Sequence, residues 1–193
     1  MKISPSVPRQ YWFPKHYADA VQRWRVRVGF VLIAIFAAVA YPGRWSLTTG
    51  LPVAALGLLL RAWAAGHLDK NGRLATSGPF AFVRNPLYLG TLLTTTGFAV
   101  ASGAWWLPLV FAAVFLMVYV PVMELEEQHL LTLFPEARAY VDRVPLLLPT
   151  KAPLDSPGRF AGSLYMRNEE YKALAAFAAG ALFLAWRAGL TGL

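Results

Sequence analysis

Long apolar stretches alternate with short polar segments along this chain. The apolar stretches cover residues 26–41, 47–65, 88–104, 105–123 and 174–190. Each approaches the ~20 residues that a helix needs to cross the hydrocarbon core of a bilayer, although the first and last are shorter. Backbone groups in lipid must bond to one another, so the pattern predicts helices rather than open strands. We therefore expect an all-α integral membrane protein with about five transmembrane helices, folded as a single membrane domain over residues 1–193.

Composition supports a membrane protein and narrows its chemistry. Hydrophobic residues make up 57% of the chain and charged residues only 15%, below the roughly 25% that is usual in soluble domains. A net charge of +8 would suit nucleic acid in a soluble protein, but basic loops beside a bilayer explain it better, so no nucleic-acid partner is expected. The chain has no cysteine, and its three histidines fit no standard metal spacing, so no metal is expected either.

Positive charge predicts the orientation in the membrane. All but two of the 18 lysines and arginines lie up to the start of the first apolar stretch, between the second and third stretches, or between the fourth and fifth, counting Arg61 with the second of these groups. Loops rich in lysine and arginine stay on the cytoplasmic side. The N-terminus and any site formed by these loops are therefore predicted to be cytoplasmic, with the C-terminus outside.

The third and fourth stretches are predicted to form a tight helical hairpin. Ser102 and Gly103 suit the turn, and the tryptophans that follow suit a membrane interface. Because the turn is short, the start of the third helix and the end of the fourth must lie on the same face of the membrane.

A polar cluster marks the start of the third helix, in the segment VRNPLYLG at residues 83–90. Asn85 can cap this helix, and Pro86 suits its first position, where a backbone N–H would have no partner. Arg84 and Tyr88 are four residues apart and share one helix face. Taken alone, these residues are also typical of a capped helix with a snorkelling arginine and an interfacial tyrosine.

Glu124, Glu126 and Glu127 form an acidic cluster at the expected C-terminal end of the fourth helix. Carboxylates at that end oppose the helix dipole, so helix stability alone does not account for them. The hairpin brings the cluster to the level of Arg84 and Tyr88. We therefore predict a cytoplasmic site at the bilayer boundary, with a solvated acidic turn as the alternative.

Two motifs resemble a known family. GPFAFVRNPLYLG is similar to the Arg-His-Pro-x-Tyr-x-Gly motif of the isoprenylcysteine carboxyl methyltransferases and the related phospholipid methyltransferases. EEQHLLTLFPEARAYVDRVP resembles their signature of Glu-Glu-x-x-Leu, then Phe-Gly, Tyr and Val-Pro. The resemblance covers about residues 61–149. We expect the single domain to comprise a cytoplasmic segment at residues 1–25, the first two spans at 26–65, a methyltransferase core with the hairpin and cofactor site at 66–149, and a linker with a C-terminal helix at 150–193.

The resemblance further implies S-adenosylmethionine as the cofactor and a lipid or prenylated small molecule as the methyl acceptor, met among membrane lipids. The cofactor-binding residues that it implies are His67, Gly72, Arg73, Leu74, Ala75, Phe80, Asn85, Pro86, Leu87, Tyr88 and Glu127. Glu126 matches the glutamate at the methyl acceptor, and Glu126 and Arg84 are the catalytic residues expected from the resemblance.

Two departures from the family pattern concern the acceptor. Asn85 stands where histidine is usual, and an asparagine can form hydrogen bonds but cannot carry a charge. The carboxyl methyltransferases also have an arginine shortly before the glutamate pair, which is missing here. A carboxylate acceptor would then need Arg84 or Arg143 as its counter-charge, whereas an amine acceptor could lose its proton to Glu126 or His129.

Other functions stay open on the sequence alone. A phospholipid or amine N-methyltransferase would share these motifs, and a nicotinamide-dependent membrane reductase could share the hairpin, although the chain has no Gly-x-Gly-x-x-Gly segment. A non-enzymatic membrane protein would use the polar clusters only as helix ends. In the alanine-rich last stretch, the spacing of Ala176 and Gly180 predicts close packing on another helix rather than chemistry.

Overall fold

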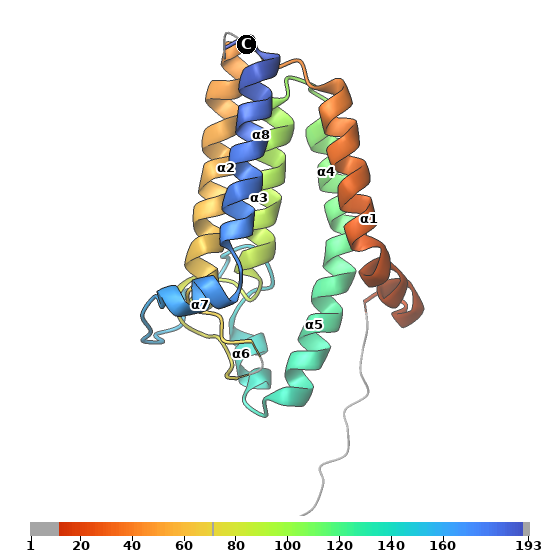
Figure 1. The fold of residues 1–193 in the computed structure, drawn as a ribbon. Coiled ribbons are helices and arrows are strands. Elements are labelled where there is room, and N and C mark those ends of the chain that lie inside the picture. Colours follow the sequence, from red (N-terminus) through yellow and green to blue (C-terminus); the bar gives the residue numbers. More distant parts are fainter. Residues whose placement is uncertain (1–11, 71, 191–193) are drawn as a thin grey trace, which may run out of the picture.

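The computed structural model describes residues 12–70 and 72–190 (Figure 1). The elements of this part are α1 (Lys15–Val39), α2 (Arg44–Ala65), η1 (Gly78–Ala81), α3 (Pro86–Ala101), α4 (Leu107–Val114), η2 (Phe115–Tyr119), α5 (Val120–Leu133), α6 (Ala137–Arg143), α7 (Gly162–Arg167) and α8 (Tyr171–Arg187). All of them are helical, so the predicted all-α class is confirmed.

Two helical segments are long and apolar enough to cross a membrane. They are α2 and the continuous helix Leu107–Leu133, which α4, η2 and α5 form together. α3 is apolar but shorter, and the crossing of the membrane by α1, α3 and α8 stays a prediction. Trp45 and Trp105 are 85% and 82% exposed near the starts of α2 and α4, as expected for aromatic side chains at a membrane interface.

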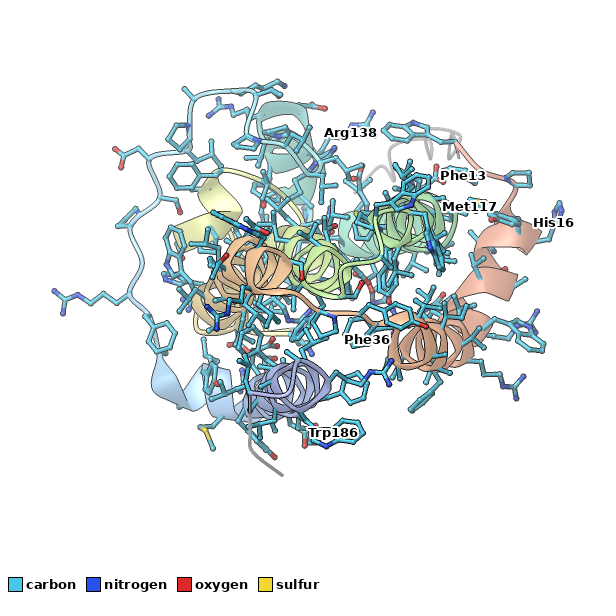
Figure 2. All side chains as sticks on the ribbon, turned by 90° about the horizontal axis from the view of Figure 1, so that it is seen from above. Phe13, His16, Phe36, Met117, Arg138 and Trp186 are labelled. Carbon is cyan, nitrogen blue, oxygen red and sulfur yellow. The ribbon has the colours of Figure 1, made fainter. Side chains whose placement is uncertain are left out.

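The helices lie in two groups. Figure 1 shows α2, α3 and α8 side by side in one group, and α1 beside α4 and α5 in the other. The groups meet near the end of α8 and diverge toward α6 and α7. Phe36 of α1 joins them, because its ring lies 6.1 Å from that of Phe98 in α3 and 6.0 Å from that of Phe183 in α8 (Figure 2).

Glycines set the close contact between α2 and α3. The residues at this contact that lack a side chain are Gly50, Gly57, Gly90 and Gly97. A Cβ atom on Gly50 would lie 2.3 Å from the backbone nitrogen of Ala101, and one on Gly97 would lie 2.3 Å from the backbone nitrogen of Ala54. The two backbones therefore touch directly, as small residues allow between membrane helices. This contact fixes α3 against α2.

The predicted hairpin is close at its turn and open beyond it. Gly103 has a φ of 79°, which favours glycine, and the backbone nitrogen of Tyr41 donates to the carbonyl of Ser102 at 2.7 Å. α3 contacts α4, whereas α5 contacts α1 and η2. The two arms diverge because the glycine face of α3 packs on α2.

The fourth apolar stretch continues as a helix beyond its predicted end. η2 is a turn of π-helix, and α5 then runs to Leu133. Pro121 lacks the N–H that an α-helix would direct to the carbonyl of Met117, and the hydroxyl of Tyr17 donates to that carbonyl at 2.8 Å. The acidic cluster consequently lies inside the helix, more than one turn before its end, where the helix dipole affects it less than the sequence implied.

The segment after α6 returns along the same end of the molecule. The backbone nitrogen of Ala161 donates to the carbonyl of Gly66 at 2.9 Å, which ties this segment to the end of α2. α8 then runs back along α2, and Nη2 of Arg187 donates at 2.8 Å to the carbonyl of Ala40, the residue that follows α1. A Cβ atom on Gly180 would lie 2.9 Å from the ring of Phe98, so the predicted packing of this glycine on another helix is confirmed.

Candidate functional site

A cavity of about 900 Å³ lies where α2 and α5 end and α3 begins. A smaller cavity of about 160 Å³ adjoins it. Both are lined by Leu68, Phe80, Arg84, Leu87, Tyr88, Glu126 and Leu130. The larger volume falls within the range of roughly 300–1,000 Å³ that is usual for ligand sites.

The two cavities bring together most of the residues that the sequence predicted. The larger one is also lined by Arg73, Leu74 and Ala75, and the smaller one by Asn85, Pro86 and Glu127. His67 and Gly72 lie outside the lining residues of both.

Two backbone hydrogen bonds tie the start of α3 to the segment after α6. The backbone nitrogens of Arg84 and Asn85 donate to the carbonyls of Pro145 and Leu146 at 2.9 and 3.2 Å. Pro86 occupies the first helical position, as predicted. The side chain of Asn85 does not cap the helix, because its Nδ2 donates to the carbonyl of Leu146 at 3.2 Å. The asparagine therefore joins two segments of the site.

Arg84 forms an ion pair with Glu127 across the smaller cavity. Nη1 of Arg84 donates to Oε2 of Glu127, and the two side chains are only 13% and 22% exposed. Nε of Arg84 is buried and has no hydrogen-bond partner among the described residues. Buried donors are normally paired, so this N–H is available to a ligand.

Tyr88 joins α3 to α5 and α1. Its hydroxyl donates to Oε1 of Glu126 at 2.7 Å, and Nη1 of Arg25 lies 3.5 Å from that hydroxyl and 3.7 Å from the same carboxylate oxygen. The convergence of the polar cluster and the acidic cluster is thus confirmed as geometry. Arg25 is a site residue that the sequence reading missed, since a basic residue at the start of α1 gives no signal of its contact with α5.

Glu124 faces away from the cavity. Its carboxylate accepts hydrogen bonds from the backbone nitrogens of Trp12 and Phe13, the second at 3.1 Å. Figure 2 shows Phe13 on the side of Met117, next to α1. Glu124 therefore holds the segment before α1, although the sequence grouped it with the other two glutamates.

The loop after α2 supports the cavity wall. The backbone nitrogen of Gly72 donates to the carbonyl of Asp69 at 3.2 Å, and a Cβ atom on Gly72 would lie 2.8 Å from the carboxyl carbon of Asp69. Asp69 also forms an ion pair with Arg167 of α7. Gly72 thus shapes the turn that presents the next residue, Arg73, to the cavity.

His67 is only 4% exposed and lies behind the cavity wall. Its Nδ1 is 3.0 Å from the hydroxyl oxygen of Ser77, and its ring fills the space beside Gly78. Burial, and to a lesser extent the charge of Arg73, lowers the pKa of His67. In this position the imidazole fastens the loop.

Tyr140 fastens α6 to the same wall. Its hydroxyl donates to the carbonyl of Phe80 at 2.9 Å, and the side chain is 5% exposed. Burial raises the pKa of Tyr140, so the hydroxyl keeps its proton as a donor. The tyrosine within the second motif thereby positions Phe80 in the first.

These features define a helical membrane protein with a polar cavity at one end of its helices. The chain matches the phospholipid methyltransferase family over residues 24–137 and belongs to that family. The resemblance seen in the two motifs is thereby confirmed at the level of the family.

Two curated relatives are similar to the chain. The cobalt-zinc-cadmium resistance protein CzcN of Cupriavidus metallidurans is 34% identical over 133 residues, and the nickel-cobalt-cadmium resistance protein NccN of Alcaligenes xylosoxydans xylosoxydans is 30% identical over 133 residues. Each alignment covers 65% of this chain and 62% of the relative, so the chain spans less than two thirds of the length of either. No solved structure matches the chain.

Proposed function

We propose that the protein is a membrane methyltransferase that uses S-adenosylmethionine to methylate a lipid-like acceptor. Family membership and the lining of the cavity support this function. The leading form of the proposal is a carboxyl O-methyltransferase similar to the isoprenylcysteine enzymes, and the alternative is N-methylation of a phospholipid or another amine. The distribution of lysine and arginine supports a cytoplasmic N-terminus and a cytoplasmic cavity.

The residues around the cavity suit the chemical groups of S-adenosylmethionine. The buried and unpaired Nε of Arg84 would donate to the carboxylate of the methionine part. Phe80 offers an aromatic surface for the purine base, and Tyr88 and Glu126 offer oxygen atoms to the cationic end. When bound, this cofactor supplies a methyl group on a positively charged sulfur.

Orientation and exclusion of water are the tasks left to the protein. Methyl transfer needs the nucleophile in line with the methyl carbon at about 3–3.5 Å, which favours a rigid wall. The direct contact of α2 and α3 supplies such a wall. Leu87, Leu130 and Val141 keep the smaller cavity largely apolar, and this limits competition by water.

The two forms of the proposal differ in the proton that must leave the acceptor. A carboxylate is ionised at neutral pH and needs no base, whereas an ammonium group must first lose a proton. Glu126 and His129 both line the larger cavity and could accept that proton. Arg25 lies 3.7 Å from Glu126, however, so this carboxylate already has a cationic partner and does not offer an unpaired negative charge to an ammonium acceptor. This pairing favours the carboxyl form.

Binding of S-adenosylmethionine to the purified protein tests the proposal. Calorimetry in detergent micelles should show saturable binding, and Arg84→Lys should weaken it about tenfold or more, because a charged hydrogen bond contributes about 1.5–3 kcal/mol. Lysine keeps the positive charge beside Glu127 but lacks the Nε donor. Arg138→Lys is the matched control, since Arg138 is exposed on α6 and lines neither cavity. The absence of binding by the wild-type protein would refute the proposal.

Turnover can be followed by mass spectrometry of lipid extracts, in which an acceptor gains one methyl group. Glu126→Gln removes the charge at the acceptor position and should lower turnover more than cofactor affinity. Glu136→Gln, at an exposed residue just after α5, should leave turnover unchanged. Equal turnover of the two variants would remove Glu126 from the proposed catalytic residues.

The names of the relatives favour one physiological setting. Both are named as metal resistance proteins, and the identity of 34% and 30% supports a related role here. Methylation of a membrane component would then contribute to tolerance of cobalt or cadmium. Cells that lack this protein should grow more slowly at raised concentrations of these metals, and the Glu136→Gln gene should restore growth where the Glu126→Gln gene does not. Unchanged growth would refute the setting and leave the methyltransferase proposal standing.

A further inference from the structure

A second large cavity lies between α1, α2, α3 and α8. Its volume is about 580 Å³, and its lining is almost entirely apolar. Phe36, Leu58 and Phe183 contribute large side chains to the wall, and Ala173 and Ala176 of α8 contribute small ones. The small side chains of α8 leave room for a ligand with a hydrocarbon chain.

Arg61 and Thr91 are shared between this apolar cavity and the larger cavity of the candidate site. The described linings have no other residue in common. The two cavities therefore meet at these side chains. A ligand with its chain in the apolar cavity would present its polar end to Arg61.

Arg61 is already bound to a carboxylate. Its Nε and Nη2 donate to the two oxygens of Glu170 at 2.5 and 3.1 Å, and its Nη1 donates to the hydroxyl of Thr91. Glu170 is only 6% exposed and directly precedes α8, outside residues 24–137 of the family match. The residue before it, Glu169, has a φ of 56°, which is uncommon for a residue with a side chain.

The two other arginines that contact the glutamates of the site are paired within it. Arg84 is bound to Glu127, and Arg25 contacts Glu126 and Tyr88. Neither of these arginines lines the apolar cavity.

We propose that Arg61 binds the carboxylate of a chain-bearing methyl acceptor, and that Glu170 holds the guanidinium in this geometry until the acceptor replaces it. The inference rests on the carboxyl form of the proposed function. Arg61 is then a specificity-determining residue, and it supplies the counter-charge that the sequence lacks before Glu126.

Exchange of one carboxylate for another accounts for the discrimination. A half-buried guanidinium that loses its partner is destabilised, so a ligand with its own anionic end displaces Glu170 more readily than a neutral ligand does. A planar guanidinium donates two parallel hydrogen bonds to a carboxylate, an arrangement that a neutral amide cannot match. The displaced side chain would lie next to Glu169, which is exposed and paired with Lys172.

Two probes that differ only in their polar end test this inference. N-acetyl-S-farnesylcysteine carries a free carboxylate, and its carboxamide has the same chain without the charge. With the full chain in detergent and no cofactor, the acid should bind at least about tenfold more tightly than the amide. Arg61→Gln should abolish this preference. Glu170→Gln should strengthen binding of the acid several-fold, because the competing carboxylate is gone.

Charge reversal separates recognition from stability. The double variant Arg61→Glu with Glu170→Arg keeps an ion pair, so a merely structural pair would retain the preference for the acid, whereas our inference requires its loss. Equal or absent binding of the two probes by the wild-type protein overturns the inference even if the Arg61 variants fail to fold. Weaker acid binding in Glu170→Gln also overturns it.

Calorimetry with S-adenosylmethionine on the same preparations distinguishes a failure of the proposed role of Arg61 from a failure of the proposed function. Cofactor binding without a preference for the acid rejects the role of Arg61 alone. Absence of cofactor binding rejects the proposed function as well.

Discussion

Replacement of Gly97 by alanine should loosen the contact between α2 and α3 and lower the stability of the protein. The added Cβ atom would lie 2.3 Å from the backbone nitrogen of Ala54, 2.7 Å from its Cα and 2.7 Å from the carbonyl oxygen of Gly50. All three are backbone atoms, so the helices themselves must move apart. Overpacking of this kind costs about 1–3 kcal/mol, and the better helix propensity of alanine offsets about 1 kcal/mol. We expect a net loss of up to about 2 kcal/mol.

Gly29→Ala is the matched control, because no atom lies within 4 Å of a Cβ at that position in α1. Thermal unfolding in detergent, followed by circular dichroism, should give a lower Tm for the Gly97 variant and an equal or higher Tm for the Gly29 variant. Since α3 carries Tyr88, the Gly97 variant should also bind S-adenosylmethionine more weakly. Equal Tm values for the two variants would refute the reasoning that the helices touch through their backbones.

Two further predictions concern the residues that fasten the cavity wall. Tyr140→Phe keeps the ring but leaves the carbonyl of Phe80 without its donor, so the free energy of unfolding should fall by about 1–3 kcal/mol. Tyr41→Phe, at a residue that is 76% exposed, should change this free energy little. An equal effect at both positions would contradict the role of the hydrogen bond. The pKa of His67 is lowered in the folded protein, so below about pH 6.5, the ordinary pKa of histidine, the unfolded chain binds more protons than the folded one. The contribution of His67 to stability is therefore fully present above this pH and should be lost as the pH falls. Melting of wild type and His67→Gln between about pH 8 and pH 5 measures this, and parallel curves for the two proteins would reject it.

The common level of the two polar clusters could be predicted because chain order alone determines it. A short turn at Ser102 and Gly103 returns the chain to the level at which α3 began, whatever the packing of the remaining helices. Tyr88 and Glu126 therefore lie at one level, and in the structure their side chains meet at 2.7 Å, although their roles in binding and catalysis stay predictions.

Contacts that depend on the packing of other helices could not be predicted. Arg25 reaches Glu126 only because α1 packs on α5, and Glu124 turns from the acidic cluster to the backbone before α1 for the same reason. Asn85 suits a helix cap, yet its side-chain amide instead donates to the carbonyl of Leu146, in the segment after α6. Local spacing gives the face of a helix but not the neighbour that covers it.

The glycines of α2 and α3 illustrate the same limit. Gly50 and Gly97 are visible in the sequence, but the sequence predicts small-residue packing only for Ala176 and Gly180 in the last helix. Glycines on two different helices form a contact only when the helices face each other, and no single stretch of sequence contains that information.

The π-helical turn of η2 sets the direction in which every later side chain of this helix points. Because a π-helical turn holds about one residue more than an α-helical turn, regular α-helix over the same residues Phe115–Tyr119 would rotate the following residues by about 100°. Glu126 would then leave Tyr88, and Glu124 would leave the segment before α1. The direction in which both carboxylates point thus depends on a stretch of apolar residues several positions earlier in the chain, which carries no catalytic group.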